Sequence, residues 1–123
     1  MTQGRKGDDI QERLIQFAAR IIKLCDALPR TNAGTHVARQ LLRSGTAPAA
    51  HHGEARSAES PQDFIHKLKI AVKEQSESEV WMRIVVASGM KTSSMMAALI
   101  DECQQLQRIL NASIKTVRDS NLR

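Results

Sequence analysis

The sequence predicts an all-α protein, an antiparallel up-and-down four-helix bundle, from three observations. Apolar residues recur at steps of three and four along four segments of the 123-residue chain. The connections between these segments are only a few residues long, and short connections favour antiparallel neighbours. Aromatic residues make up 2% of the chain, which argues against a β-sandwich. A chain of this length forms one ordinary domain, so we expect residues 1–123 to be a single domain. The apolar spacing predicts helices at about 9–28, 32–56, 61–88 and 94–118.

The first predicted helix carries more apolar residues than one bundle seam requires. Asp8 or Asp9 can cap its N-terminus, and Pro29 ends it. Its main stripe consists of Ile10, Leu14, Phe17, Ile21, Leu24 and Leu28. Beside this stripe runs a second apolar row, formed by Ile15, Ile22 and Cys25. The broad apolar surface predicts that this helix contacts more than its own bundle.

The second predicted helix changes composition halfway along. It starts near Thr31 or Asn32, either of which can accept the unpaired amide groups of a first turn. Small residues dominate residues 44–58, which could form a long loop or a helix that lets a neighbouring backbone approach closely. Pro48 would kink such a helix because it removes one hydrogen bond. We favour a kinked helix that ends near Arg56.

The third predicted helix has the clearest start signal in the chain. Ser60 can cap it, Pro61 fits its first turn, and Asp63 favours the positive end of the helix dipole. Its seam consists of Phe64, Leu68, Ala71, Gln75, Ser78, Met82 and Val85, and Gly89 follows as a stop signal. The two polar members of this seam, Gln75 and Ser78, need hydrogen-bond partners if they are buried.

The fourth predicted helix begins around residues 92–94 and repeats the same spacing. Its seam consists of Met96, Leu99, Cys103, Leu106, Leu110 and Val117. The two cysteines, Cys25 and Cys103, lie far apart in sequence and have no partner at metal-ligand spacing. We therefore expect both to be buried free thiols.

The candidate metal ligands of the bundle are incomplete. His51 with Glu54, and Asp63 with His66, each lie three residues apart and so share a helix face. A di-metal bundle also needs further inward-facing acidic residues, which the sequence lacks. No strained nucleophile turn or phosphate-binding loop is present in the sequence either. We expect no metal, no cofactor and no enzymatic activity.

The adjacent histidines His51 and His52 form the most unusual dipeptide of the chain. A seven-residue stripe along the second helix consists of Val37, Leu41, Ser44, Pro48, His51 and Ala55. This stripe predicts that His51 faces the core or an adjoining subunit. A buried neutral imidazole needs partners, and Gln75, Ser78 and Glu54 are the open alternatives.

The charge and hydropathy of the chain suggest where it works. A net charge of +5 gives a mild attraction to nucleic acid, although a solvated helical surface explains the scattered basic residues about as well. No apolar stretch reaches the length of a membrane span, and residues 1–9 lack the apolar centre of a signal peptide. We expect a cytoplasmic protein.

Two motifs, Arg-Ser-Gly-Thr at residues 43–46 and Asp-Phe-x-x-Lys at residues 63–67, lie within a longer similarity. Over about residues 9–118 the chain resembles the small four-helix-bundle proteins first noticed as reading frames in intervening sequences of bacterial large-subunit ribosomal RNA genes. A more distant resemblance is to the accessory protein of diversity-generating retroelements. The resemblance implies a ring-like homopentamer and, in the retroelement relatives, a basic surface that engages nucleic acid and a reverse transcriptase.

Three functional hypotheses follow. The leading one is a homo-oligomeric, nucleic-acid-associated accessory protein, and the alternatives are an oligomeric protein–protein scaffold and, last, an enzyme. The residues that we predict to bind RNA or DNA are Arg39, Arg43, Arg56, Lys67 and Lys73. The residues that we predict to form the oligomer interface are Ile15, Ile22, Ile65, Val72, Trp81 and Val86. The expected partners are further copies of the chain, possible nucleic acid and possible protein, with no membrane.

Overall fold

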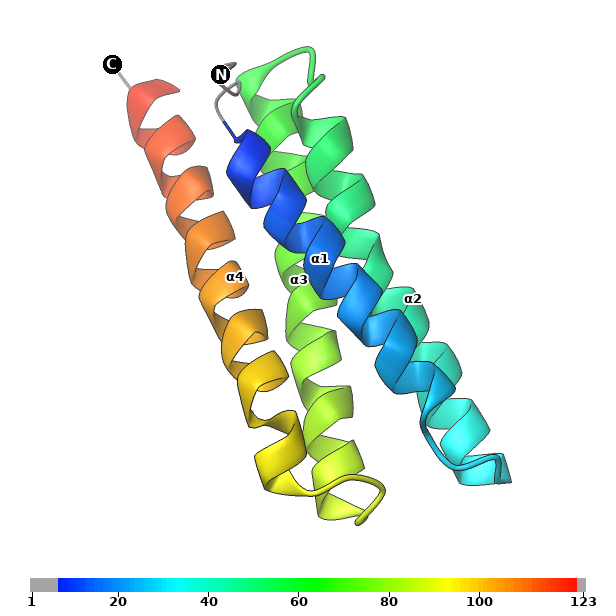
Figure 1. The fold of residues 1–123 in the computed structure, drawn as a ribbon. Coiled ribbons are helices and arrows are strands. Elements are labelled where there is room, and N and C mark those ends of the chain that lie inside the picture. The colour runs from blue at the N-terminus through cyan, green and yellow to red at the C-terminus, as the bar shows by residue number, and fades with distance from the viewer. Residues whose placement is uncertain (1–6, 122–123) are drawn as a thin grey trace, which may run out of the picture.

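The computed structural model describes residues 7–121, which contain four α-helices and no strand within that range. Helix α1 spans Asp8–Asp26, α2 Asn32–Ala55, α3 Pro61–Ala87 and α4 Ser93–Asn121. Successive helices run in opposite directions and pack into an up-and-down bundle (Figure 1). The predicted all-α, four-helix fold is confirmed, and the predicted helix ends differ from the observed ones by at most three residues.

The helix starts follow local hydrogen bonding. Thr31 Oγ1 accepts from the amide of Gly34 at 3.0 Å, and Ser60 Oγ accepts from the amide of Asp63 at 3.0 Å. Both caps are those that the sequence predicted. The prediction for α1 was wrong, because its N-cap is Gly7 in the left-handed conformation, with no side-chain cap. Here the chain needs a positive φ of 89°, which glycine adopts without strain.

Helix α2 is continuous through Pro48, so the helical alternative for its small-residue half is correct and the loop alternative is wrong. The small residues allow α1 and α2 to approach closely. A Cβ atom added at Gly45 would lie 2.7 Å from Ile21 Cγ2. Glycine at this position therefore sets the spacing of the two helices.

The core contains apolar side chains from every helix and a polar layer near its middle. The predicted seam of α3 is buried from Leu68 to Val85, including Gln75 and Ser78, whereas its first member, Phe64, is only half-buried. Ser78 Oγ and Ser44 Oγ form a hydrogen bond of 2.9 Å between α3 and α2. Neither polar atom of the Gln75 side chain has a protein partner among residues 7–121. On α4 the buried residue of the last turns is Ile114, whereas the predicted Val117 is only half-buried.

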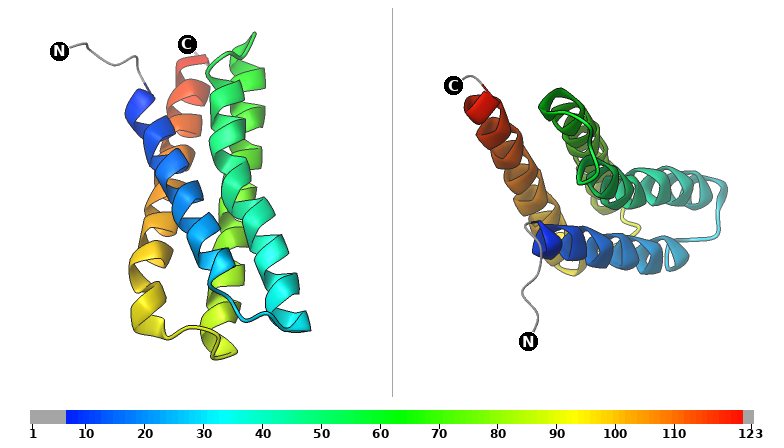
Figure 2. Two further views of the ribbon diagram at one scale, coloured as in Figure 1. Left: turned by 45° about the vertical axis from the view of Figure 1, so that its right-hand side comes forward. Right: turned by 90° about the horizontal axis from the view of Figure 1, so that it is seen from above.

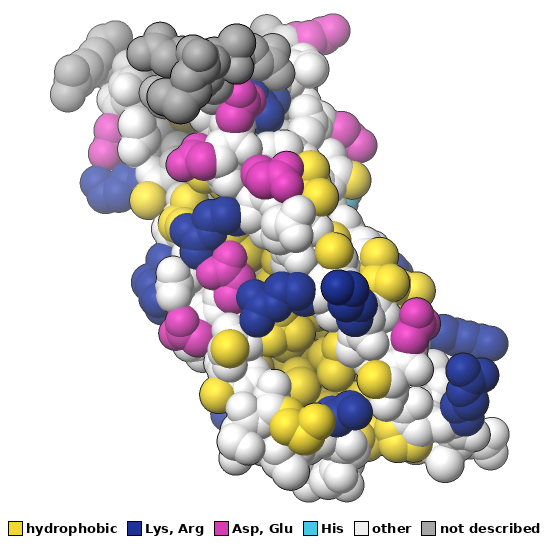
Figure 3. Space-filling model, viewed as in Figure 1, with side chains coloured by type: hydrophobic (Ala, Val, Ile, Leu, Met, Phe, Trp, Pro, Cys, Tyr) yellow, Lys and Arg dark blue, Asp and Glu magenta, His cyan; other side chains and the backbone are white. Residues whose placement is uncertain are grey.

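Helices α1 and α4 do not close the bundle along their whole length. They touch over little of their extent, while α1 packs mainly on α2 and α4 on α3. Figure 2 shows that α1 and α4 diverge towards their ends. Between them Arg13 joins the two helices, with Nη2 2.6 Å from Glu102 Oε1 and 3.2 Å from Gln105 Oε1. Figure 3 shows hydrophobic side chains on the floor of a hollow on this side of the molecule.

No helix within residues 7–121 combines the length and the apolar character that a bilayer crossing requires.

Candidate interaction surfaces

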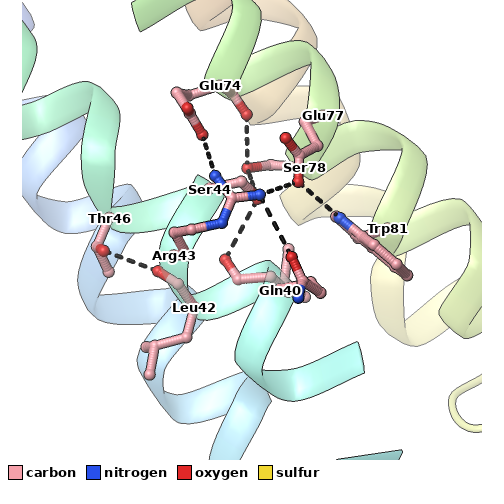
Figure 4. A network of polar contacts seen from close by, with 10 residues as sticks. Gln40, Leu42, Arg43, Ser44, Thr46, Glu74, Glu77, Ser78 and Trp81 are labelled. Atoms are coloured by element: carbon pink, nitrogen blue, oxygen red, sulfur yellow. Dashed lines mark hydrogen bonds and ion pairs between the residues drawn. The ribbon is translucent and has the colours of Figure 1, made fainter. Parts of the chain in front are cut away.

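A polar cluster joins α2 to α3 on the surface (Figure 4). Arg43 Nη1 lies 3.0 Å from Glu74 Oε2, and Nη2 pairs with the carboxylate of Glu77 and with Gln40 Oε1 at 3.4 Å. Trp81 Nε1 donates to Glu77 Oε2 at 2.9 Å. We call Gln40, Arg43, Glu74, Glu77 and Trp81 the Arg43 cluster. It fixes the orientation of an arginine and a tryptophan, both of which are enriched at protein interfaces.

An exposed apolar face lies beside this cluster on α3. Val80 and Ile84 are 54% and 38% exposed, and their spacing of four residues puts them on one side of the helix. Trp81 lies next to them, and its ring meets that of His36 edge-on at a centroid distance of 5.8 Å. We call Val80, Trp81 and Ile84 the α3 face. The sequence prediction included Trp81 but missed its two exposed neighbours, which lie off the α3 seam.

Exposed apolar side chains also lie on α1 and α2. Ile15 and Ile22, seven residues apart on one side of α1, are 43% and 45% exposed, and Leu42 on α2 is 41% exposed. We call these three residues the α1/α2 face. Ile22 and Leu42 lie close in sequence to Ile21 and Gly45, where the two helices approach closely. The structure therefore leaves on the surface the two α1 residues that were predicted for an interface.

The remaining predicted interface residues have a different environment. Ile65, Val72, Trp81 and Val86 are half-buried and pack against the core of their own chain. The bundle itself thus covers much of the surface that Ile65, Val72 and Val86 were predicted to present on α3. A large exposed side chain that the sequence prediction missed is Met95, on α4.

The five predicted nucleic-acid-binding residues fall into two groups. Three of them form ion pairs. Arg43 pairs with Glu74 and Glu77, Arg56 pairs with Asp8, and Lys67 pairs with Glu54. The hydrogen bond from Lys67, at 3.0 Å, lowers the pKa of Glu54. Arg39 and Lys73 are exposed, and no ion pair joins either of them to another residue in the described range. The sequence between residues 27 and 53 contains no Asp or Glu, so Arg39 and Arg43 are the charged side chains of α2 before Glu54.

The histidine prediction needs correction. His52, not His51, is the buried member of the pair, with 5% of its surface exposed. None of the three partners suggested for His51 forms a hydrogen bond with it in the described range, and the buried His51 Nδ1 has no partner there. His52 Nδ1 instead lies 2.5 Å from Gln11 Oε1 on α1. Burial, and then the neighbouring Arg56, lower the pKa of His52.

The other candidate chemistry is sparse. Within residues 7–121 no group of three or more His, Cys, Asp or Glu side chains is arranged to hold a metal ion. Cys25 and Cys103 are buried free thiols. Burial raises the pKa of Cys25 to about 11 and that of Cys103 to about 12, so neither is a reactive thiolate near neutral pH.

Comparison with known proteins identifies the family. The family model described as 23S rRNA-intervening sequence protein matches residues 8–112. A crystal structure of a protein of unknown function from the S23 ribosomal protein family of Bacteroides thetaiotaomicron has a TM-score of 0.82 and 31% sequence identity. The match covers 86% of this chain and 98% of that one. No curated protein matches the chain. The matched residues include all of α1 to α3 and most of α4, and the chain belongs to the 23S rRNA-intervening sequence protein family.

Proposed function

We propose that the chain is a non-enzymatic accessory protein that assembles into a closed homo-oligomer, a pentamer by the resemblance, and associates with RNA. The observation that carries the assembly is the pair of exposed apolar faces on different helices. Exposed apolar patches of this kind commonly mark interaction sites. When one face of a subunit meets a different face of the next, the contacts generate a ring if the rotation closes.

The composition of the two faces supports direct pairing between copies. The α1/α2 face carries aliphatic side chains only, whereas the α3 face has an aromatic side chain held by Glu77 and His36. Tryptophan and arginine dominate the binding energy of many interfaces, particularly where polar residues surround an apolar centre. The Arg43 cluster would form such a polar border around the α3 face.

The association with RNA rests on charge and on the family. Arg39 and Lys73 are exposed, and α2 carries no acidic residue before Glu54. Contacts between such side chains and phosphate act mainly by releasing counterions, so binding should tolerate sequence changes and weaken with salt. Repetition around a ring would place these charges at several points of one RNA. The family is named after intervening sequences of 23S rRNA, and this genetic link to ribosomal RNA supports the choice of RNA as the partner to test.

Light scattering tests the assembly. Wild-type protein should show an oligomeric mass at micromolar concentration. Ile22→Glu and Val80→Glu should each lower that mass while circular dichroism still reports a helical protein, because both side chains are exposed in the single chain. Gln16→Glu adds the same charge at an exposed position of α1 outside the α1/α2 face and should leave the mass unchanged. A monomeric wild type would refute the assembly, and an unchanged mass in both face variants would refute these faces.

Electrophoretic mobility shifts with a structured 23S rRNA fragment test the proposed association with RNA. Arg39→Gln combined with Lys73→Gln should weaken binding and reduce its dependence on salt, since two phosphate contacts are removed. Arg108→Gln with Lys115→Gln removes the same charge from α4 and should have a smaller effect. Wild-type protein that retains no RNA at low salt would favour the alternative, an oligomeric scaffold for another protein.

A further inference from the structure

A cavity opens at the end of the bundle where α1 begins and α4 ends. Its volume is about 760 Å³, which lies within the range of sites that hold small molecules. Its lining residues come from the start of α1, the end of α4 and the adjoining ends of α2 and α3. These helix ends lie together at one end of the bundle (Figure 2). Most lining side chains are apolar, among them Ile10, Ala55, Phe64, Ile109, Ala112 and Val117. None of these residues belongs to the α1/α2 face or the α3 face.

One wall of the cavity is polar, and the hydrogen bonds there determine which ring nitrogen of the neutral His52 carries the proton. Gln11 Nε2 donates to the carbonyl oxygen of Ala49 at 3.0 Å, so the other end of this amide, Oε1, faces His52 Nδ1. Oε1 can only accept, which assigns the proton of the neutral imidazole to Nδ1 and the lone pair to Nε2. Nε2 has no hydrogen-bond partner among residues 7–121. The cavity therefore has a hydrogen-bond acceptor on its wall.

Arg56 supplies donors on the same wall. It is the charged residue of the lining, and its largely buried side chain pairs with Asp8 in the first turn of α1. This pairing offsets the positive charge, while a guanidinium has five N–H donors and can serve a further acceptor. The side chains of Arg56 and His52 both lie near Gly7. A Cβ atom added to Gly7 would lie 3.8 Å from Arg56 Nε and 3.9 Å from His52 Cε1. Acceptor and donors thus lie close together.

We propose that this cavity binds an uncharged amphipathic small molecule, an alcohol or phenol, through the paired acceptor of His52 and donors of Arg56. The hydroxyl group donates to His52 Nε2 and accepts from Arg56, while the apolar body contacts Phe64, Ile109 and Val117. A carboxylate fits less well, because it would face the lone pair of Nε2 and compete with Asp8 for Arg56. An ammonium group would face the positive charge of Arg56.

Calorimetric titration with 1-octanol, octanoate and octylammonium tests this assignment, because the three share one chain length. We expect 1-octanol to bind at one site per chain and about tenfold more tightly than octanoate, the difference that one well-made hydrogen bond supplies. His52→Phe should remove the preference for the alcohol. Asp8→Asn should reverse it in favour of octanoate, since Arg56 would then lack its carboxylate partner.

Two alanines of α4 provide a matched pair for locating the site. Ala112 lines the cavity, whereas Ala97 is exposed elsewhere on the same helix. Ala112→Phe should abolish binding, and Ala97→Phe should leave it unchanged, with both proteins remaining helical. Equal binding of all three ligands, or no binding of any, would overturn the proposal. So would an altered oligomeric mass of Ala112→Phe with unchanged octanol binding, which would show that a second copy occupies the cavity.

Discussion

At the scale of single residues, His52 shows how neighbours on two helices determine one protonation state. Its ring is buried and contacts Gln11 of α1, and the charge that acts on it is that of Arg56, the C-cap residue of α2, which pairs with Asp8 of α1. The cavity lining from α3 and α4 contains no charged side chain. Burial and Arg56 both disfavour the imidazolium form, so the pKa of His52 is lowered on folding.

This lowered pKa predicts that acid destabilises the fold. As the pH falls through the unfolded-state pKa of about 6.5, the unfolded chain takes up a proton at His52 before the folded chain does. The stability that the neutral His52 contributes is therefore complete above that pH and declines below it. Urea unfolding of wild type and His52→Gln at pH 8 and pH 5.5 should show a smaller loss in the variant.

His66→Gln, on the exposed side of α3, controls for the removal of an imidazole as such. If wild type and His52→Gln lose the same free energy of unfolding between the two pH values, His52 does not titrate in this way.

At the scale of the helices, α2 contacts both α1 and α3 and meets them with different chemistry. Towards α3 it presents the Arg43 cluster and the hydrogen bond between Ser44 and Ser78. Towards α1 it presents small residues, of which Gly45 lies against Ile21. Because Ile21 is completely buried, its side chain has little room to move away from an added methyl group.

Two glycines of α2 allow a paired test of this contact. Gly45→Ala should lower the free energy of unfolding by about 1–3 kcal/mol, the cost of overpacking a core. Gly53→Ala should instead raise it by up to about 1 kcal/mol, since alanine favours helix over glycine. At Gly53 the added Cβ would lie 3.7 Å from the Gln11 side chain, an ordinary contact. Thermal and urea unfolding measure both changes, and equal effects of the two substitutions would argue against a close approach at Gly45.

The sequence was sufficient for the helices but not for every side chain in them. Caps at Thr31 and Ser60 and the seam of α3 depend on residues close in sequence, so local patterns predicted them. The burial of His52 depends on α1, which covers positions 45 and 52 through Ile21 and Gln11. A strict seven-residue stripe drifts around a helix of 3.6 residues per turn. Because of this drift, the stripe predicted that His51, not His52, would be buried.

The candidate sites were harder to predict than the fold. Ion pairs between helices occupy Arg43, Arg56 and Lys67, and such pairs follow from the packing of α2 on α1 and α3. The exposure of Val80 and Ile84 likewise depends on where the other helices lie. The cavity has no counterpart in any local pattern, because its lining combines residues from all four helices.

At the scale of the whole molecule, the bundle is tightly packed on three sides and open on the fourth. The pairs α1–α2, α2–α3 and α3–α4 account for most of the contacts between helices. Between α1 and α4, Arg13 pairs with Glu102 and contacts Gln105. Packing within these three helix pairs therefore supplies much of the stability of the chain that carries the apolar faces and the end cavity.

If exposed faces pair between copies, association and stability must be linked. A partner that binds only the folded chain stabilises it by mass action, so the thermal midpoint should rise with protein concentration. We expect the midpoint of the wild type to increase measurably over a hundredfold range of concentration. In Ile22→Glu and Val80→Glu it should depend on concentration much less, and it should approach the wild-type value at the lowest concentration, where every protein is monomeric. Gln16→Glu should follow the wild type throughout. The measurement should cover concentrations above those at which light scattering finds dissociation. If the wild-type midpoint does not change with concentration there, association does not stabilise the folded chain through these faces.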